Sequence, residues 1–460
     1  MSAKTEVRTP SPAMGARSSD DSILQGMFAG AFGGLLALAL LKLGNPAILQ
    51  KLVTQPTNIY EWILAGWPSV VGYWLLGVVA VLGIAVARWR TNVPLWLAGL
   101  PLAWLAWEAI AATQTEWPRL TGPTMEHFVT CVVCFYLGFF SLTGGKKLAF
   151  FWLALFAGFT LVMVSGFSQH FGGLEESQKY WLTYVYPKLE VIPPGYMEKM
   201  SSRRIFSTLF YPNTLAEAIL LIYPAMLAVI WSLRERFTAG ARGLLMGVAS
   251  AGAMGCLFWS GSKGGWLLML VIGLAGTMYF PMKRQVKVML IYVVLVLGLA
   301  GFFVKYMGFF KKGATSVVAR FDYWKAAAQT ARDKPVFGSG PGTFEKSYEQ
   351  RKRPESEMAR MAHNDYLQQA SDSGVPGFVL YTAMVVGSLT YIWRYGRLED
   401  DWIRLAVWLG LLGWALQNFI EFGLYIPAVA WVAFGLLGWL LRQTGNQIYN
   451  RKTASYSGAA

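Results

Sequence analysis

The stretch ILQGMFAGAFGGLLALALLKL, residues 23–43, decides the fold, because Lys42 is its only charged side chain. A helix of about 20 apolar residues is long enough to cross the hydrocarbon core of a bilayer. Comparable runs recur along the chain, and we expect about twelve membrane helices. The runs lie near 23–43, 62–87, 93–112, 127–143, 148–167, 214–233, 243–260, 264–281, 287–305, 374–394, 402–420 and 424–441.

The composition agrees with a membrane protein. Hydrophobic residues make up 55% of the 460-residue chain and charged residues 14%, and the mean hydropathy is +0.40. A soluble domain usually carries about a quarter charged residues. The net charge of +15 would suggest nucleic acid in a soluble protein. Here basic cytoplasmic loops and anionic lipid headgroups account for it, so we expect an all-α integral membrane protein with no nucleic-acid partner.

The three cysteines do not predict a metal or redox site. Cys131 and Cys134 have C-x-x-C spacing within the apolar stretch FVTCVVCFYLGFF, and Cys256 stands alone. Such sites need polar surroundings and usually a second cysteine pair. We therefore expect Cys131 and Cys134 to be small side chains on a buried helix face.

The basic residues of the short loops predict an orientation. With both termini in the cytoplasm, cations gather in the inner loops, at Arg88, Arg90, Lys146, Lys147, Arg234, Arg236, Arg242, Lys283, Arg284, Lys287, Arg394, Arg397 and Arg404. The predicted domains are a disordered cytoplasmic tail at 1–22, helices one to nine over 23–305 with an outer loop at 168–213, a large outer loop at 306–373, helices ten to twelve over 374–441, and a disordered tail at 442–460.

The large outer loop is polar, basic and organised. TSVVARFDYWKAAAQTARDK, residues 315–334, predicts an amphipathic helix with Val317, Phe321, Trp324 and Ala328 on its apolar face. PVFGSGPGTF, residues 335–344, is a turn region that brings its backbone close to another part of the protein. PESEMARMAHNDYLQQASDSG, residues 354–374, predicts a second helix, with Pro354 near its start and Gly374 past its end.

Several residues at the outer side can carry chemistry. His363 is one of three histidines and can act as a base near neutral pH, although polar loops also carry histidines without a role. Arg204 and Arg320 can each bind two phosphate oxygens at once through the guanidinium group. Lys263 in the turn SGSKGG can bind phosphate as a point charge. The alternative for these cations is contact with lipid headgroups.

Acidic side chains near the ends of spans need partners. Glu108, Glu217 and Glu421 are costly there unless they are paired or wet. They can pair with the arginines and hold them, or they can relay protons. Asn213 follows Pro212 at a predicted helix start and is a possible cap.

Taken in order, these motifs resemble the O-antigen ligase and O-antigen polymerase superfamily over about residues 200–380. Arg204 with Ser207, Thr208, Pro212 and Asn213 resembles that family's R…PN segment, and SGSKGG resembles its outer S-R-G/A turn. The remaining likenesses are Arg320 with Trp324, the segment PVFGSGPGTF, and AHNDYLQ at 362–368. The resemblance implies a GT-C-like fold with a long helical periplasmic loop between helices nine and ten.

The resemblance also implies a function. An O-antigen ligase transfers a glycan from undecaprenyl diphosphate to a lipid A core hydroxyl at the periplasmic face of the bacterial inner membrane, with no cofactor and no metal. A polymerase of the same superfamily, a protein O-oligosaccharyltransferase, and a flippase or transporter of lipid-linked glycans are the alternatives.

By position, His363 would be the base, and Arg204 and Arg320 would bind the diphosphate. Lys263 stands where the family often has arginine, so it would be a weaker clamp. Attack from the face opposite the diphosphate would invert the anomeric carbon. The other residues that we expect to contact substrate are Arg203, Asn213, Arg360, Asn364, Asp365 and Tyr366.

Overall fold

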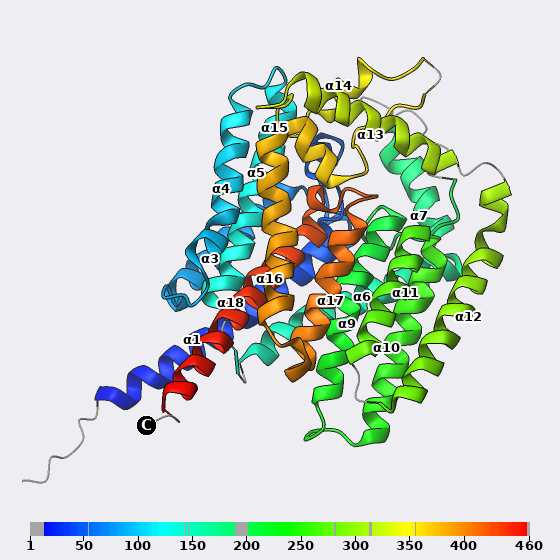
Figure 1. The fold of residues 1–460 in the computed structure, drawn as a ribbon. Coiled ribbons are helices and arrows are strands. Elements are labelled where there is room, and N and C mark those ends of the chain that lie inside the picture. Colours follow the sequence, from blue (N-terminus) through cyan, green and yellow to red (C-terminus); the bar gives the residue numbers. More distant parts are fainter. Residues whose placement is uncertain are drawn as a thin grey trace, which may run out of the picture.

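A computed structural model describes residues 13–457, except 54, 143, 146, 189–200, 280–281, 312–314 and 355. The described parts are all-helical, without a strand (Figure 1). The long helices are α1 (Ala13–Lys42), α3 (Ser69–Val86), α4 (Leu95–Ala112), α5 (Pro118–Tyr136), α6 (Leu148–Ser168), α9 (Pro212–Ser232), α10 (Ala239–Ser260), α11 (Lys263–Tyr279), α12 (Arg284–Lys311), α13 (Thr315–Asp333), α15 (Asp365–Thr382), α17 (Trp402–Gln417) and α18 (Pro427–Ser457). Shorter helices are α2 (Ile59–Leu64), α7 (Leu174–Tyr180), α14 (Phe344–Glu349) and α16 (Ser388–Tyr395).

The expectation of an all-α membrane protein is confirmed. In the described part of the chain, nine helical segments are long and apolar enough to cross a bilayer, and two shorter apolar helices, α11 and α17, accompany them. Each of the twelve expected runs coincides with a helix, including α18 for 424–441. The count of about twelve spans and the GT-C-like architecture stay predictions.

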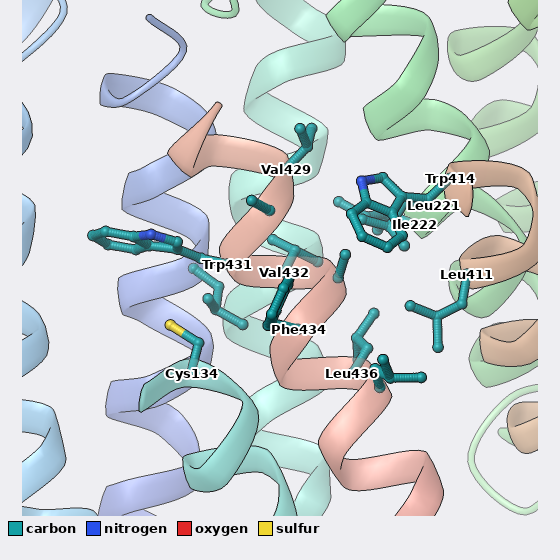
Figure 2. Close-up of a cluster of buried hydrophobic side chains, with 14 of the residues drawn as sticks. Cys134, Leu221, Ile222, Leu411, Trp414, Val429, Trp431, Val432, Phe434 and Leu436 are labelled. Atoms are coloured by element: carbon teal, nitrogen blue, oxygen red, sulfur yellow. The ribbon is translucent and has the colours of Figure 1, made fainter. Parts of the chain in front are cut away.

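The centre of the bundle is α18, which lies between helices that are far apart in the sequence. Trp431, Val432 and Phe434 of α18 are almost fully buried. Figure 2 shows Val432 and Phe434 between Cys134 of α5 on one side and Trp414 and Leu221, from α17 and α9, on the other, while Trp431 points away from Trp414. Cys134 and its neighbour Cys131 are free and buried, as the apolar surroundings predicted. Close packing of this kind fixes the positions of the helix ends, where the polar residues lie.

The large loop folds over one end of the bundle, at the top of Figure 1. Its helices α13 and α14 enclose a small second core with the residues that precede α15. The predicted helix 315–334 is confirmed as α13, but its predicted apolar face holds for one of four residues. Trp324 is half-buried against the loop core, while Val317, Phe321 and Ala328 are exposed. The buried side chains of α13 are Tyr323, Ala326, Ala327 and Thr330.

The second predicted loop helix begins eleven residues later than Pro354 suggested. Residues 356–364 are not helical, and α15 starts at Asp365. The reason is Asn364, whose side chain accepts a hydrogen bond from the backbone N–H of Leu367 and caps the helix. The predicted stop is confirmed, because Gly374 has a φ of 70° and interrupts the helix. His363 therefore lies before the helix and not on it.

The two chain ends differ from the prediction as far as they are described. Helix α18 continues through residue 442 to Ser457, so the expected disordered tail is helical there. Helix α1 begins at Ala13, within the tail expected at 1–22, and residues 1–12 lie outside the described part. In Figure 1 the ends of α1 and α18 extend from the bundle on the side opposite to α13 and α14.

Candidate active site

A single buried carboxylate, that of Glu421, joins three segments of the chain. It lies in the loop between α17 and α18. Its Oε1 accepts hydrogen bonds from Arg320 Nη2 of α13 at 2.5 Å and from Asn213 Nδ2 of α9 at 2.5 Å. Its Oε2 lies 3.2 Å from Nδ1 of His363. The predicted pairing of a glutamate with an arginine thus holds for Glu421.

Glu421 is ionised at neutral pH. Burial by itself disfavours the charged form, but the hydrogen bond from His363 and the positive charges of Arg320 and Arg204 outweigh it. Together they lower the pKa of Glu421 below its ordinary 4.5. Because an ionised carboxylate only accepts hydrogen bonds, we assign the proton of the neutral imidazole of His363 to Nδ1. Nε2 then carries the free lone pair.

The backbone and the ring of His363 are both held in place. Its φ of 50° is in the left-handed region, which non-glycine residues rarely adopt. Trp324 of α13 donates its indole N–H to the carbonyl of His363 at 3.3 Å. The imidazole stacks on Tyr323 at 5.8 Å between ring centroids and meets Phe422 edge-on at 4.8 Å. The side chain is 29% exposed, so solvent or a substrate can reach it.

Arg204 lies in a segment that enters the bundle between α7 and α9. The neighbouring Ile205 and Leu209 are fully buried. The amide of Gln169 ties the segment down, because its oxygen accepts from two backbone N–H groups and its nitrogen donates to the carbonyl of Ser207. A loop held in this way can present a charged side chain at a fixed position.

The guanidinium of Arg204 is fixed at two points. Nε donates to the carbonyl of Ser260 at 2.7 Å, and Nη2 donates to Oδ1 of Asn213 at 2.8 Å. Asn213 is therefore a bridge from Arg204 to Glu421. The expectation that it caps the helix is wrong, because the cap position of α9 is Tyr211 and Pro212 is the first helical residue.

Of the other predicted cations, Lys263 lies close to Arg204 and Arg320, whereas Arg203 and Arg360 lie elsewhere. The charges of Arg204 and Arg320 both act on Lys263, which is half-buried at the start of α11. Arg203 is exposed. Arg360 lies 3.7 Å from Glu345 of α14, at the side of the loop core. Lys263 is thus close to the site, while Arg203 and Arg360 form no hydrogen bond or ion pair with Glu421 in the part of the chain that the structure describes.

The three residues after His363 support the structure around it. Asn364 caps α15. Asp365 is buried, accepts from the N–H of Leu424, and donates its own N–H to the carbonyl of Asn418. Tyr366 is buried, and its hydroxyl donates to the carbonyl of Ala415. They tie α15 to the loop that carries Glu421. Their predicted contact with substrate stays a prediction.

The glycine-rich segment 335–344 packs directly against α15 and helps to fix its position. Gly342 has a φ of 76°, its N–H donates to Asp372 at 2.9 Å, and a Cβ there would lie 2.1 Å from Oγ1 of Thr124. A Cβ on Gly374 would lie 2.1 Å from the carbonyl oxygen of Val336. The close approach expected for this segment is therefore to α5 and α15. Glu108, in the same region, pairs with Ser373 and not with an arginine.

Sequence reasoning missed Lys305 and Tyr306 of α12. The ring of Tyr306 lies near both Lys263 and Lys305, and the charge of Arg204 acts on Lys305 and Tyr306. The available signal was a lysine at the end of the apolar run 287–305, at the same end of its helix as the other candidate cations.

Comparison with known proteins finds a family model that matches the part of the chain carrying three of these side chains. Residues 248–382 match the family model described as O-antigen ligase, which is less than half of the chain. The match includes Lys263, Arg320 and His363, and it excludes Arg204 and Glu421. No curated protein matches the chain. Residues 248–382 are thus similar to the O-antigen ligase family, and together with the apolar helices this match supports a membrane protein with a function of the ligase or polymerase type.

Proposed function

We propose that the protein is a glycosyltransferase that moves a glycan from undecaprenyl diphosphate to an acceptor hydroxyl. The observation that carries the proposal is the position of Glu421. Its two oxygens join His363, a candidate base, to Arg320, a candidate phosphate ligand. Through Asn213 the same carboxylate also reaches Arg204. A base and a cationic clamp on one carboxylate suit a reaction that needs both.

His363 is suited to accept the proton of the acceptor hydroxyl. A sugar hydroxyl is a poor nucleophile, and a base within hydrogen-bond reach accelerates its attack by roughly 10²–10⁴-fold. Nε2 takes the proton while Nδ1–H stays on Glu421. The imidazolium that results is stabilised by the Glu421 carboxylate, as in other pairs of a histidine and a carboxylate.

Arg204 and Arg320 are suited to hold the leaving diphosphate. Guanidinium groups bind phosphate oxygens in a planar, two-point geometry. Cations that are fixed before the reaction stabilise the charge that develops when the sugar–phosphate bond breaks. Charge from these side chains makes a metal ion unnecessary in the proposed reaction. Attack from the side opposite the diphosphate inverts the anomeric carbon.

The local charge fits such a donor. Arg204, Arg320 and Lys263 are cations near the ionised Glu421, so the site carries surplus positive charge. A diphosphate ester supplies negative charge that complements it. Burial lowers the pKa of Arg204, and the nearby charge of Glu421 opposes this effect. An incoming anion favours the charged form of Arg204 in the same way.

The proposed acceptor is a hydroxyl of the lipid A core, which makes the protein an O-antigen ligase. The proposed location is the bacterial inner membrane, with both termini in the cytoplasm and the site at the periplasmic face. The cations of the short loops support this orientation. A polymerase or a protein O-oligosaccharyltransferase of the same superfamily differs in the acceptor, so the acceptor decides among them.

The test is product analysis with the purified full-length protein in lipid nanodiscs. It receives an undecaprenyl-diphosphate-linked glycan together with a lipid A core, a second glycan chain or an acceptor peptide. A glycan on the lipid A core, with inverted configuration and in the presence of excess chelator, supports the proposal. Transfer only to the glycan chain or the peptide replaces the ligase assignment by an alternative. If the protein moves the lipid-linked glycan across the bilayer but transfers no glycan to any acceptor, the proposal that it is a glycosyltransferase is wrong.

A further inference from the structure

A second group of cations lies beside Arg204, around the ring of Tyr306. Nζ of Lys263 lies 5.3 Å from the centroid of this ring, and Nζ of Lys305 lies 5.6 Å from it. The charge of Arg204 acts on Lys263, Lys305 and Tyr306 alike. Helices α11 and α12 supply these side chains, and the indole of Trp266 joins the two helices through a hydrogen bond to the carbonyl of Gly298.

In the described part of the chain, the hydroxyl of Tyr306 has no hydrogen-bond partner. The residue is 6% exposed, and its oxygen is buried without a partner among the described residues. A buried hydroxyl that makes no hydrogen bond destabilises the folded protein. Because this hydroxyl lies in a group of cations, an anionic oxygen is the partner that the surroundings favour.

The positive charges of Lys305 and Arg204 are not paired with a carboxylate in the described part of the chain. Lys305 donates to the carbonyl of Phe258 and sits 3.2 Å above its ring. These contacts orient the ammonium group but do not neutralise it. Like charges that are held together in a partly buried place are stabilised by a bound anion.

We propose that Lys305 and Tyr306, with Lys263, form a second phosphate subsite next to Arg204. The inference rests on the proposed function and deepens it. Arg320 shares Glu421 with His363, so the sugar-linked phosphate binds at Arg320 and Arg204. The lipid-linked phosphate of the same diphosphate binds at Lys305, Lys263 and the hydroxyl of Tyr306. The protein thereby selects a diphosphate over a monophosphate carrier.

The phosphate of a membrane lipid headgroup has the same chemistry as the lipid-linked phosphate of the donor. A headgroup site accepts any anionic lipid and makes no distinction between one and two phosphates. A diphosphate subsite favours undecaprenyl diphosphate over both undecaprenyl monophosphate and phosphatidylglycerol. The two sources are therefore separated by comparing these three lipids as ligands.

The experiment measures binding of radiolabelled undecaprenyl diphosphate and undecaprenyl monophosphate to the full chain in nanodiscs, with phosphatidylglycerol as competitor. The variants are Lys305→Met and Tyr306→Phe. The matched control is Lys287→Met, on the same helix but at its other end. We expect Lys305→Met to lower diphosphate affinity about tenfold, Tyr306→Phe to lower it several-fold, and both to leave monophosphate affinity unchanged.

The inference is overturned if Lys305→Met binds the diphosphate as Lys287→Met does, or if both phosphate lipids lose affinity equally. Displacement of the diphosphate by an equal amount of phosphatidylglycerol also overturns it, because the site is then a headgroup site. Failure of the proposed function looks different. In that case the diphosphate lipid binds with the expected preference, but no glycan is transferred to any acceptor.

Discussion

Asn213 lies between Arg204 and Glu421 and bonds both. Its Oδ1 accepts from Arg204 Nη2 at 2.8 Å, and its Nδ2 donates to Glu421 Oε1 at 2.5 Å. An amide is suited to this position, because it offers an acceptor to the cation and a donor to the anion. The side chain thus sets the distance between the proposed clamp and the carboxylate that holds the proposed base.

Substitutions at Asn213 test whether its link between Arg204 and Glu421 matters for transfer. Asn213→Asp removes the donor and places a second carboxylate against Glu421, so we expect transfer to fall about 100-fold. Asn213→Leu removes both hydrogen bonds without adding charge and is expected to lose less activity. Initial rates with a lipid-linked glycan check both values. Equal activity of the aspartate and leucine variants would show that charge at this position has no effect.

The left-handed backbone of His363 allows an unusual test of the base. His363→Gly removes the imidazole and fits the φ of 50° without strain, whereas His363→Ala keeps the strain and is expected to be less stable. We expect both variants to lose transfer. Added imidazole is expected to restore part of the activity of the glycine variant only. The measurement is product yield against imidazole concentration, and transfer by either variant without imidazole would remove His363 from the mechanism.

The clamp is tested by Arg320→Ala, Arg320→Lys and the same changes at Arg204. We expect the alanine variants to lose 10²–10³-fold in kcat/KM for the donor and the lysine variants to recover only part, because an ammonium group lacks the planar fork. The control is Arg332→Ala, in the last turn of the same helix as Arg320. If both alanine variants keep the rate of this control, neither arginine binds the diphosphate.

The lowered pKa of Glu421 predicts how the stability of the protein depends on pH. The folded pKa lies below 4.5, so stability from the ionised form is complete above pH 4.5 and is lost as the pH falls through the folded value. At pH 7 we expect Glu421→Gln to cost about 1–3 kcal/mol, because it removes the negative charge that pairs with half-buried Arg320. The difference from the unchanged protein is expected to shrink below pH 4.5. Thermal unfolding across this range is the measurement, and a difference that grows in acid would contradict the assignment.

A substitution at Gly374 tests whether the close packing of segment 335–344 against α15 is needed for stability and activity. A Cβ there would lie 2.1 Å from the carbonyl oxygen of Val336, and the φ of 70° disfavours any side chain. We expect Gly374→Ala to destabilise the protein by about 1–3 kcal/mol and to lower transfer. The matched control is Gly77→Ala, in a helix where the added Cβ meets nothing within 4 Å. Thermal unfolding of both variants decides whether the local geometry matters.

The sequence predicted the parts of the molecule that depend on local pattern. The apolar runs, the break between α10 and α11 at SGSKGG, helix α13 and the stop at Gly374 follow from composition, periodicity and glycine. The start of α15 was also a local signal. Proline is common at helix starts, so Pro354 suggests a start there, whereas Asn364 is the stronger cap and marks the observed start.

The contacts of the site could not be predicted in the same way. Glu421 lies 58 residues from His363 and 101 from Arg320, and only the packing of α17 and α18 brings it to them. Nothing local distinguishes it from Glu108 or Glu217, which have no arginine partner among the described residues. The buried face of α13 could not be predicted locally for the same reason. It is determined by packing against the aromatic residues of the loop core that come from α14.

The boundary of the matched segment runs through the site, since Glu421 follows its end and Arg204 precedes its start. A chimera that transplants residues 248–382 alone into another scaffold would carry the imidazole and one guanidinium without the carboxylate that aligns them. Successful grafts would have to include the segment around Arg204 and the turn between the last two helices. Exchanges designed to change the acceptor should therefore take the segment around Arg204, residues 248–382 and the turn around Glu421 from the same parent protein.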